Sequence, residues 1–111
     1  MTEHSSSKYL SDILQAIEPV ESFTSGISSY PEYLADLKTQ SAVERQLGII
    51  GEAINKLDKS FPELSLNNVR QIVGLRNRLI HAYDAIDPSI IWAILRNHLS
   101  QLKTEVSEKL R

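Results

Sequence analysis

The chain has 111 residues, of which 41% are hydrophobic and 23% charged, and its formal net charge at pH 7 is −2. Without cysteine it has no disulfide, thiolate metal ligand or cysteine nucleophile, and no apolar run approaches the ~18 residues of a membrane span. An acidic chain exerts no overall attraction on nucleic acid, so any RNA or DNA contact needs a local basic patch. We expect one globular domain over residues 1–111, with residues 1–6 as a flexible tail. The polar N-terminus does not resemble a signal peptide, so we expect a cytoplasmic protein with no membrane contact.

The first helix is predicted from Ser7, because apolar residues then recur at helical spacing. The residues that carry this pattern are Leu10, Ile13, Leu14, Ile17, Val20 and Phe23. Pro19 lies inside the pattern and cannot bond the carbonyl of Gln15, which predicts a kink or a break. Ser25-Gly26 predicts the end of this helix.

A second long helix is predicted after a connection over residues 27–38, which holds one short helical turn following Pro31. Thr39 or Ser41 is the predicted N-cap, and Glu44 completes a capping box with Ser41. Apolar residues then repeat at intervals of 4, 3, 4 and 3, which indicates a heptad-like packing seam. The seam consists of Val43, Leu47, Ile50, Ile54 and Leu57.

Two glycines, Gly48 and Gly51, lie within this helix. Each costs roughly 1 kcal/mol relative to alanine in a helix interior. Two interpretations stay open: a neighbouring backbone comes close to the helix at these positions, or the glycines are merely tolerated.

Residues 60–62 (Ser-Phe-Pro) are predicted to end the second helix, and Asn67 or Ser65 to cap a third. Asp87 is the predicted N-cap of a single last helix, with Pro88 in its first turn. That helix is expected to direct inward Ile91, Leu95, His98, Leu99, Leu102 and Val106. No segment alternates with period two over a useful length, so the sequence predicts an all-α fold, an up-and-down bundle of four to five helices with short connections.

The third helix carries an unusual set of polar side chains within an apolar pattern: Arg76, Asn77, His81 and Tyr83. At about 100° per residue, Arg76 and Tyr83 fall on the apolar arc of this helix, whereas His81 and Asn77 fall on the opposite side. A buried arginine needs a carboxylate partner, a solvated cleft or a second subunit. Arg76 and His81 are five residues apart and diverge on one helix, so joint action on one phosphate requires helix distortion or a two-fold dimer.

Each of these residues also has a structural interpretation. Arg76 can form a salt bridge with Glu44 or Glu52, His81 can be a surface or capping residue, and Tyr83 can be a core aromatic. The remaining candidates are solvated charges at Arg70 and Arg78, a packing residue at His98 and a tail residue at His4. No His/Asp/Glu trio has metal-ligand spacing and no glycine-rich phosphate loop is present, so we expect no metal and no cofactor. The residues alone indicate a phosphate-handling Arg/His pair.

The segment 76–83, Arg-Asn-Arg-Leu-Ile-His-Ala-Tyr, resembles the R-x4-H-x-Y signature of HEPN-domain toxins of the HepT-like branch. Segments 12–18, 37–45, 50–53 and 86–92 also resemble that branch, so the likeness covers roughly residues 8 to 106. The resemblance implies a HEPN-like helical bundle and a metal-independent endoribonuclease. It also implies a homodimer, or a higher oligomer, in which two motifs form a composite active site.

Carried over to this chain, His81 acts as general base or acid on a ribose 2′-hydroxyl, which suits its ordinary pKa of ~6.5. Arg76 stabilises charge on the phosphoryl oxygens, and Asn77 orients the imidazole or the phosphate. Arg78 and Arg70 supply an RNA-binding patch. The product is a 2′,3′-cyclic phosphate and a 5′-hydroxyl, and the RNA substrate is tRNA, mRNA or a broader set.

The resemblance further implies a type VII-like HEPN/MNT toxin–antitoxin system. Its MNT-type nucleotidyltransferase antitoxin transfers AMP to the motif tyrosine, here Tyr83, and so places bulk and negative charge where RNA must lie. This requires Tyr83 to be reachable at the dimer cleft. Two alternatives remain: a non-catalytic helical module that binds the nucleotidyltransferase or a nucleotide, and a purely structural bundle.

Overall fold

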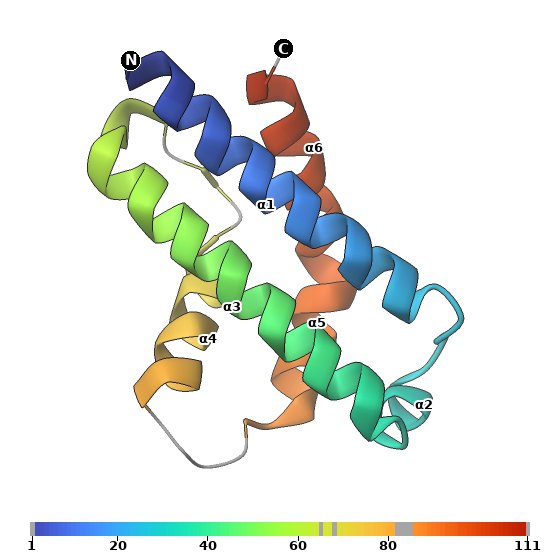
Figure 1. Cartoon of the computed structure of the whole chain (residues 1–111). Helices are drawn as coiled ribbons and strands as arrows, with labels where there is room; N and C mark the ends of the chain where they lie inside the picture. The colour runs from blue at the N-terminus through green and yellow to red at the C-terminus, as the bar shows by residue number, and fades with distance from the viewer. Residues whose placement is uncertain (1, 65, 68, 82–85, 111) are drawn as a thin grey trace.

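The computed structural model of the chain describes residues 2–64, 66–67, 69–81 and 86–110, with the side chains of all but residues 2–5 and 79–81. The elements are α1 (Thr2–Thr24), α2 (Tyr30–Leu34), α3 (Leu37–Ser60), the 3-10 helix η1 (Pro62–Leu64), α4 (Arg70–His81), α5 (Pro88–Asn97) and α6 (Leu99–Leu110) (Figure 1). The described ranges contain no strand, and the all-α prediction is confirmed.

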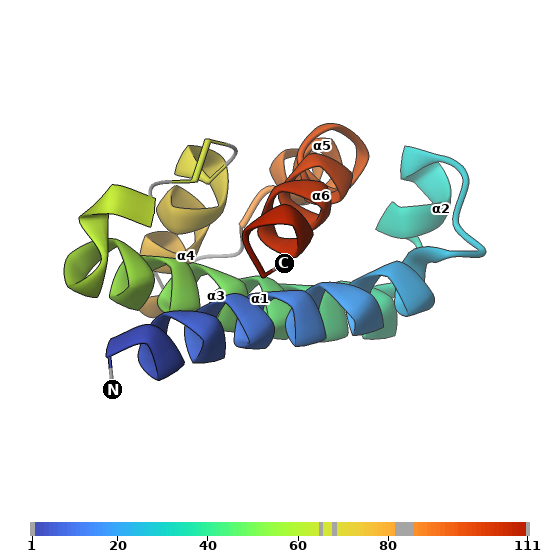
Figure 2. The same ribbon diagram turned by 90° about the horizontal axis from the view of Figure 1, so that it is seen from above.

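Two layers make up the bundle. The long helices α1 and α3 lie side by side and form one layer, and α2, α4 and the α5–α6 pair all lie on the same side of it (Figure 2). The seam predicted on α3 is fully buried between the layers: Val43, Leu47 and Ile50 have no exposed surface, and Ile54 and Leu57 have 2%. No helix within the described ranges is long and apolar enough to cross a membrane.

The first helix begins earlier than predicted and ends as predicted, at Thr24 just before Ser25-Gly26. It begins at Thr2 rather than Ser7, because apolar periodicity marks only the buried part of a helix. It continues through Pro19 without a break. Gln15 is exposed, so solvent can bond the carbonyl that Pro19 leaves without a donor. Phe23, the last residue of the apolar pattern, is 44% exposed at the end of the helix.

The short turn after Pro31 is confirmed as α2, but the cap of α3 was wrongly predicted. Asp36 is the N-cap, and its carboxylate accepts hydrogen bonds from the Thr39 backbone N–H at 3.0 Å and the Thr39 hydroxyl at 2.7 Å. Gln40, a buried polar residue, donates to the carbonyls of Tyr33 and Leu34. These bonds satisfy the C-terminal end of α2 and fix it against α3.

The predicted end of α3 at Ser60 is confirmed, whereas the cap predicted for α4 at Asn67 is wrong. The helix begins at Arg70, and the Asn67 N–H donates instead to the Glu105 carboxylate of α6 at 2.8 Å. The alternative cap, Ser65, lies outside the described residues.

The last segment forms two helices rather than one. Asp87 is confirmed as N-cap and accepts from the Ser89 N–H at 2.9 Å. His98, half-buried as predicted, ends α5 with φ −121° and ψ −30°. The buried residues Ile94 and Leu99 are five apart, so a continuous helix would turn one of them away from the core by about 140°. The bend at His98 lets both face inward.

Candidate functional site

The helix α4 crosses α3 at Gly51. A Cβ atom on Gly51 would lie 2.5 Å from Cβ of Arg76 and 3.3 Å from the carbonyl oxygen of Ile72. These distances are too short for any side chain, so glycine is required for α4 to approach this closely. Of the two interpretations of the helix glycines, close approach therefore holds at Gly51.

Next to this crossing, Arg76 is held in one orientation by Glu52. Its Nη2 donates to Glu52 Oε2 at 2.6 Å, and its Nη1 donates to Asn77 Oδ1 at 3.0 Å. The Arg76 side chain is 19% exposed and that of Glu52 41%. The expected carboxylate partner is therefore Glu52 and not Glu44, which is half-buried and whose pKa is raised by burial.

The guanidinium has donors left over for another ligand. Arginine carries five N–H donors, and two of them are engaged by Glu52 and Asn77. Nε of Arg76 is buried and has no hydrogen-bond partner among the described residues, so the donors left for a ligand are the second N–H groups of Nη1 and Nη2. The hydrogen bond from Arg76 keeps the pKa of Glu52 below its usual range, so this carboxylate is ionised near neutral pH.

His81 is the last residue of α4, and its side chain lies outside the described set, as does the whole of Tyr83. Arg70 and Arg78 are both exposed, at opposite ends of α4 and about 12 Å apart along its axis. The structure thus brings Asn77 to Arg76 but does not gather Arg70 and Arg78 into one patch. Within the described residues no group of three or more His, Cys, Asp or Glu side chains is placed to hold a metal ion.

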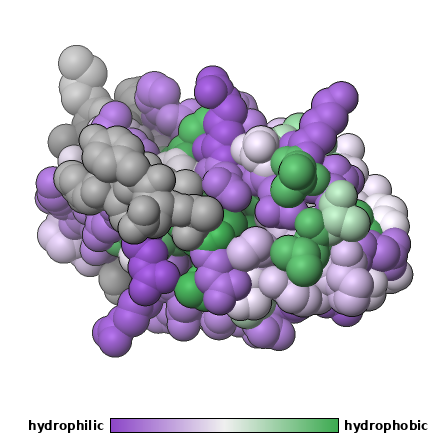
Figure 3. All heavy atoms as spheres, turned by 90° about the horizontal axis from the view of Figure 1, so that it is seen from below, coloured by the Kyte–Doolittle hydropathy of each residue, from purple (hydrophilic) through white to green (hydrophobic). Residues whose placement is uncertain are grey.

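The end of the bundle where α4 finishes is partly apolar. Figure 3 views this end, with hydrophobic atoms showing among hydrophilic ones. The start of α5, the start of α3 and α2 all lie there (Figure 1) and carry the exposed side chains Ile90, Leu37 and Leu34, respectively. Ile90 and Arg78 line a shallow pocket of about 230 Å³.

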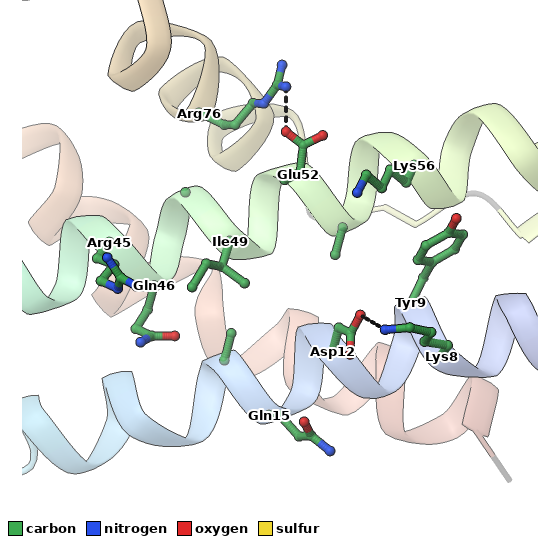
Figure 4. Close-up of a pocket in the computed structure, with 13 residues that line it drawn as sticks. Lys8, Tyr9, Asp12, Gln15, Arg45, Gln46, Ile49, Glu52, Lys56 and Arg76 are labelled. Atoms are coloured by element: carbon green, nitrogen blue, oxygen red, sulfur yellow. Dashed lines mark hydrogen bonds and ion pairs between the residues drawn. The ribbon is translucent and has the colours of Figure 1, made fainter.

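A groove of about 830 Å³ runs between α1 and α3 and has Arg76 at its edge (Figure 4). Lys8 and Asp12 of α1 line it and pair with each other at 3.1 Å. From α3 come Arg45 and Lys56, for which no hydrogen bond or ion pair is found in the described part of the chain.

Sequence reasoning did not single out Arg45, Glu52 and Lys56 as one group. A signal was present: with Ile49 they are spaced by 4, 3 and 4 residues and so share one face of α3. The same spacing is typical of an ordinary solvated helix face, so the pattern alone does not identify a site.

The Arg76–Glu52 pair makes a prediction about pH. Because the pKa of Glu52 is lowered on folding from 4.5, its ionised form stabilises the fold above pH 4.5, and this contribution disappears as the pH falls through the folded-state pKa. We expect Glu52→Gln to be less stable than wild type in urea at pH 7, with a difference that shrinks at pH 3.5. A difference that stays constant between these pH values would contradict an ionic contribution.

Comparison with known proteins identifies the family of this chain. The family described as Ribonuclease HepT-like matches residues 13–108. The probable ribonuclease HepT of Thermococcus cleftensis is 40% identical, with 93% of each chain covered. A putative RNase of Methanocaldococcus jannaschii is 37% identical, with 96% of this chain and 97% of the relative covered. A putative RNase of Caldanaerobacter subterraneus is 36% identical, with 93% and 92% covered. No solved structure matches significantly. The chain belongs to the HepT-like ribonuclease family.

Proposed function

We propose that this protein is an endoribonuclease that cleaves RNA by attack of a ribose 2′-hydroxyl, without a metal ion. The observation that carries the proposal is the fixed guanidinium of Arg76, which Glu52 and Asn77 hold at the edge of a groove, on the same helix that ends at His81. Membership of a ribonuclease family supports RNA as the substrate.

In the proposed reaction, His81 takes the proton from the 2′-hydroxyl, and the 2′-oxygen attacks the adjacent phosphorus. The bond to the 5′-oxygen breaks, and an imidazolium protonates that oxygen as it leaves. Arg76 balances the charge that develops on the non-bridging oxygens, for which its free N–H donors are suited. The products are a 2′,3′-cyclic phosphate and a 5′-hydroxyl.

A homodimer with a composite active site is part of the proposal. Positions 76 and 81 are five residues apart, a spacing that diverges on an ideal helix, so we propose that two copies of the helix present both groups to one phosphate. The exposed apolar side chains Leu34, Leu37 and Ile90, at the end of the bundle where α4 finishes, offer surface for such a contact. Each protomer is proposed as one domain over residues 1–111, which the Lys103–Glu21 ion pair between α6 and α1 supports.

We further propose that the protein works in the cytoplasm as the toxin of a type VII-like system. A nucleotidyltransferase antitoxin would add AMP to Tyr83 and so block the RNA site with bulk and negative charge. The motif spacing, with the tyrosine two residues beyond His81, supports this assignment. The intact mass of protein co-produced with the antitoxin and ATP tests it: an increment of one AMP, lost in Tyr83→Phe, is expected.

The test of the proposed function is incubation of purified protein with total RNA in EDTA. Wild type is expected to fragment the RNA, and His81→Ala purified in parallel controls for contaminating ribonuclease. A well-folded, unmodified wild type that leaves RNA intact would contradict the proposal and favour a non-catalytic module that binds a nucleotidyltransferase or a nucleotide.

A further inference from the structure

The groove between α1 and α3 has a charge distribution unlike that of the chain as a whole. The chain carries a net charge of −2, yet the groove has four cationic side chains (Lys8, Arg45, Lys56 and Arg76) and two carboxylates. Both carboxylates are engaged inside the groove, Asp12 by Lys8 at 3.1 Å and Glu52 by Arg76 at 2.6 Å. The groove is therefore a local basic patch on an acidic protein.

Among the described residues, Arg45 and Lys56 are the groove cations without an ion pair, and they lie on either side of the Arg76–Glu52 contact. Arg45 precedes Glu52 by seven residues and Lys56 follows it by four, so along α3 they lie about 10 Å and about 6 Å from it. Figure 4 shows Arg45, Ile49, Glu52 and Lys56 along α3, with Arg76 above Glu52. A row of positive charge thus extends in both directions from the residue proposed to bind the scissile phosphate.

We propose that this row is a phosphate-binding track for single-stranded RNA: Arg45 and Lys56 contact the backbone on the two sides of the nucleotide that Arg76 engages. The inference rests on the proposed function for the role of Arg76. The groove also contains Tyr9 and the exposed side chain of Ile49, whose apolar surfaces can pack against bases or riboses, as in other grooves for single strands.

A second copy of the chain fits this groove less well. A two-fold contact would place this groove against the equivalent groove of a second copy. Arg45 and Lys56, which have no ion pair among the described residues, would then need carboxylates from the partner's groove. Both groove carboxylates are already paired. A polyanion meets this charge pattern without leaving cations buried and unpaired.

The test is fluorescence anisotropy of His81→Ala protein with a 5′-labelled, unstructured 12-nucleotide RNA at several KCl concentrations. In that background Arg45→Gln and Lys56→Gln are each expected to weaken binding about fivefold at 0.1 M salt and to reduce the slope of log K against log salt by about 0.7. The matched control is Lys38→Gln, an exposed residue of the same helix outside the groove, which is expected to change neither quantity.

Equal affinities and slopes for Arg45→Gln, Lys56→Gln and Lys38→Gln would overturn the track. So would a loss of dimer mass in Arg45→Gln or Lys56→Gln, because the groove would then be an interface between copies. Failure of the track is distinct from failure of the proposed function. If wild type cuts RNA and the slopes do not change, only the proposed phosphate-binding track is contradicted. If the slopes change but wild type does not cut RNA, the groove is supported as an RNA-binding site and the proposed cleavage reaction is contradicted.

Discussion

His81→Ala is expected to lower the rate of RNA cleavage about 100- to 10,000-fold, the range typical of a lost general acid or base. Arg76→Ala is expected to lower it about 100- to 1,000-fold, because a donor aimed at developing phosphoryl charge acts mainly on the transition state. Arg76→Lys keeps the charge but not the fork that bonds Glu52 and Asn77, so it should recover only part of the rate. Initial rates on one RNA preparation measure all three.

Circular dichroism, urea unfolding and the mass of the protein in solution separate an effect on folding from an effect on the reaction in these variants. Glu52 is 41% exposed, so water can solvate its carboxylate when Arg76 is removed, and Arg76→Ala is expected to fold. Near wild-type rates in folded His81→Ala or Arg76→Ala protein would contradict the roles proposed for these residues. A rate lost only in proportion to the folded fraction would indicate a structural role instead.

Gly51→Ala is expected to destabilise the protein by about 1–3 kcal/mol, the usual cost of forcing a methyl group into a packed contact. The new Cβ would lie 2.5 Å from Cβ of Arg76, so α4 must move away from α3 and carry the guanidinium with it. Cleavage should therefore fall as well. The direction of the change in stability is informative, because alanine is otherwise favoured over glycine in a helix by about 1 kcal/mol.

Gly74→Ala is the matched control for this prediction. A Cβ at Gly74, on the exposed side of α4, meets no atom within 4 Å. This variant should be as stable as wild type or up to about 1 kcal/mol more stable, with unchanged cleavage. Urea unfolding of both variants provides the comparison. A stabilised and active Gly51→Ala protein would show that the α3–α4 crossing does not fix the position of Arg76.

The buried faces of the helices could be predicted from the sequence because buried positions are occupied by apolar residues that recur at helical spacing. The seam from Val43 to Leu57 is buried as predicted, and Asp87 caps α5 as its position before Pro88 indicated. The predictions of helix ends failed where the end depends on residues of another element or on packing in the core. Glu105 engages the Asn67 N–H, and the bend at His98 follows from the five-residue step between two core positions.

The candidate site, too, could be predicted from the sequence only in part. That Arg76 needs a partner follows from its place on the apolar arc of α4, and the family resemblance assigns it a role. Which carboxylate it meets does not follow, because Glu44 and Glu52 are both on α3 and only the crossing at Gly51 selects Glu52. The basic groove could not be predicted from net charge, since it depends on pairing of Asp12 and Glu52 by local cations.

Cleavage by attack of the 2′-hydroxyl without a metal ion leaves RNA ends of a defined chemistry. Fragments produced by wild type in EDTA would be labelled with polynucleotide kinase lacking phosphatase activity, with and without prior phosphatase treatment, and their 3′ ends analysed by mass spectrometry. The proposed reaction predicts that each downstream fragment begins with a 5′-hydroxyl that accepts label without prior phosphatase treatment. It predicts that each upstream fragment has a 2′,3′-cyclic phosphate at its 3′ end. Fragments with 5′-phosphate ends, or cleavage that appears only when a divalent metal ion is restored, would contradict it.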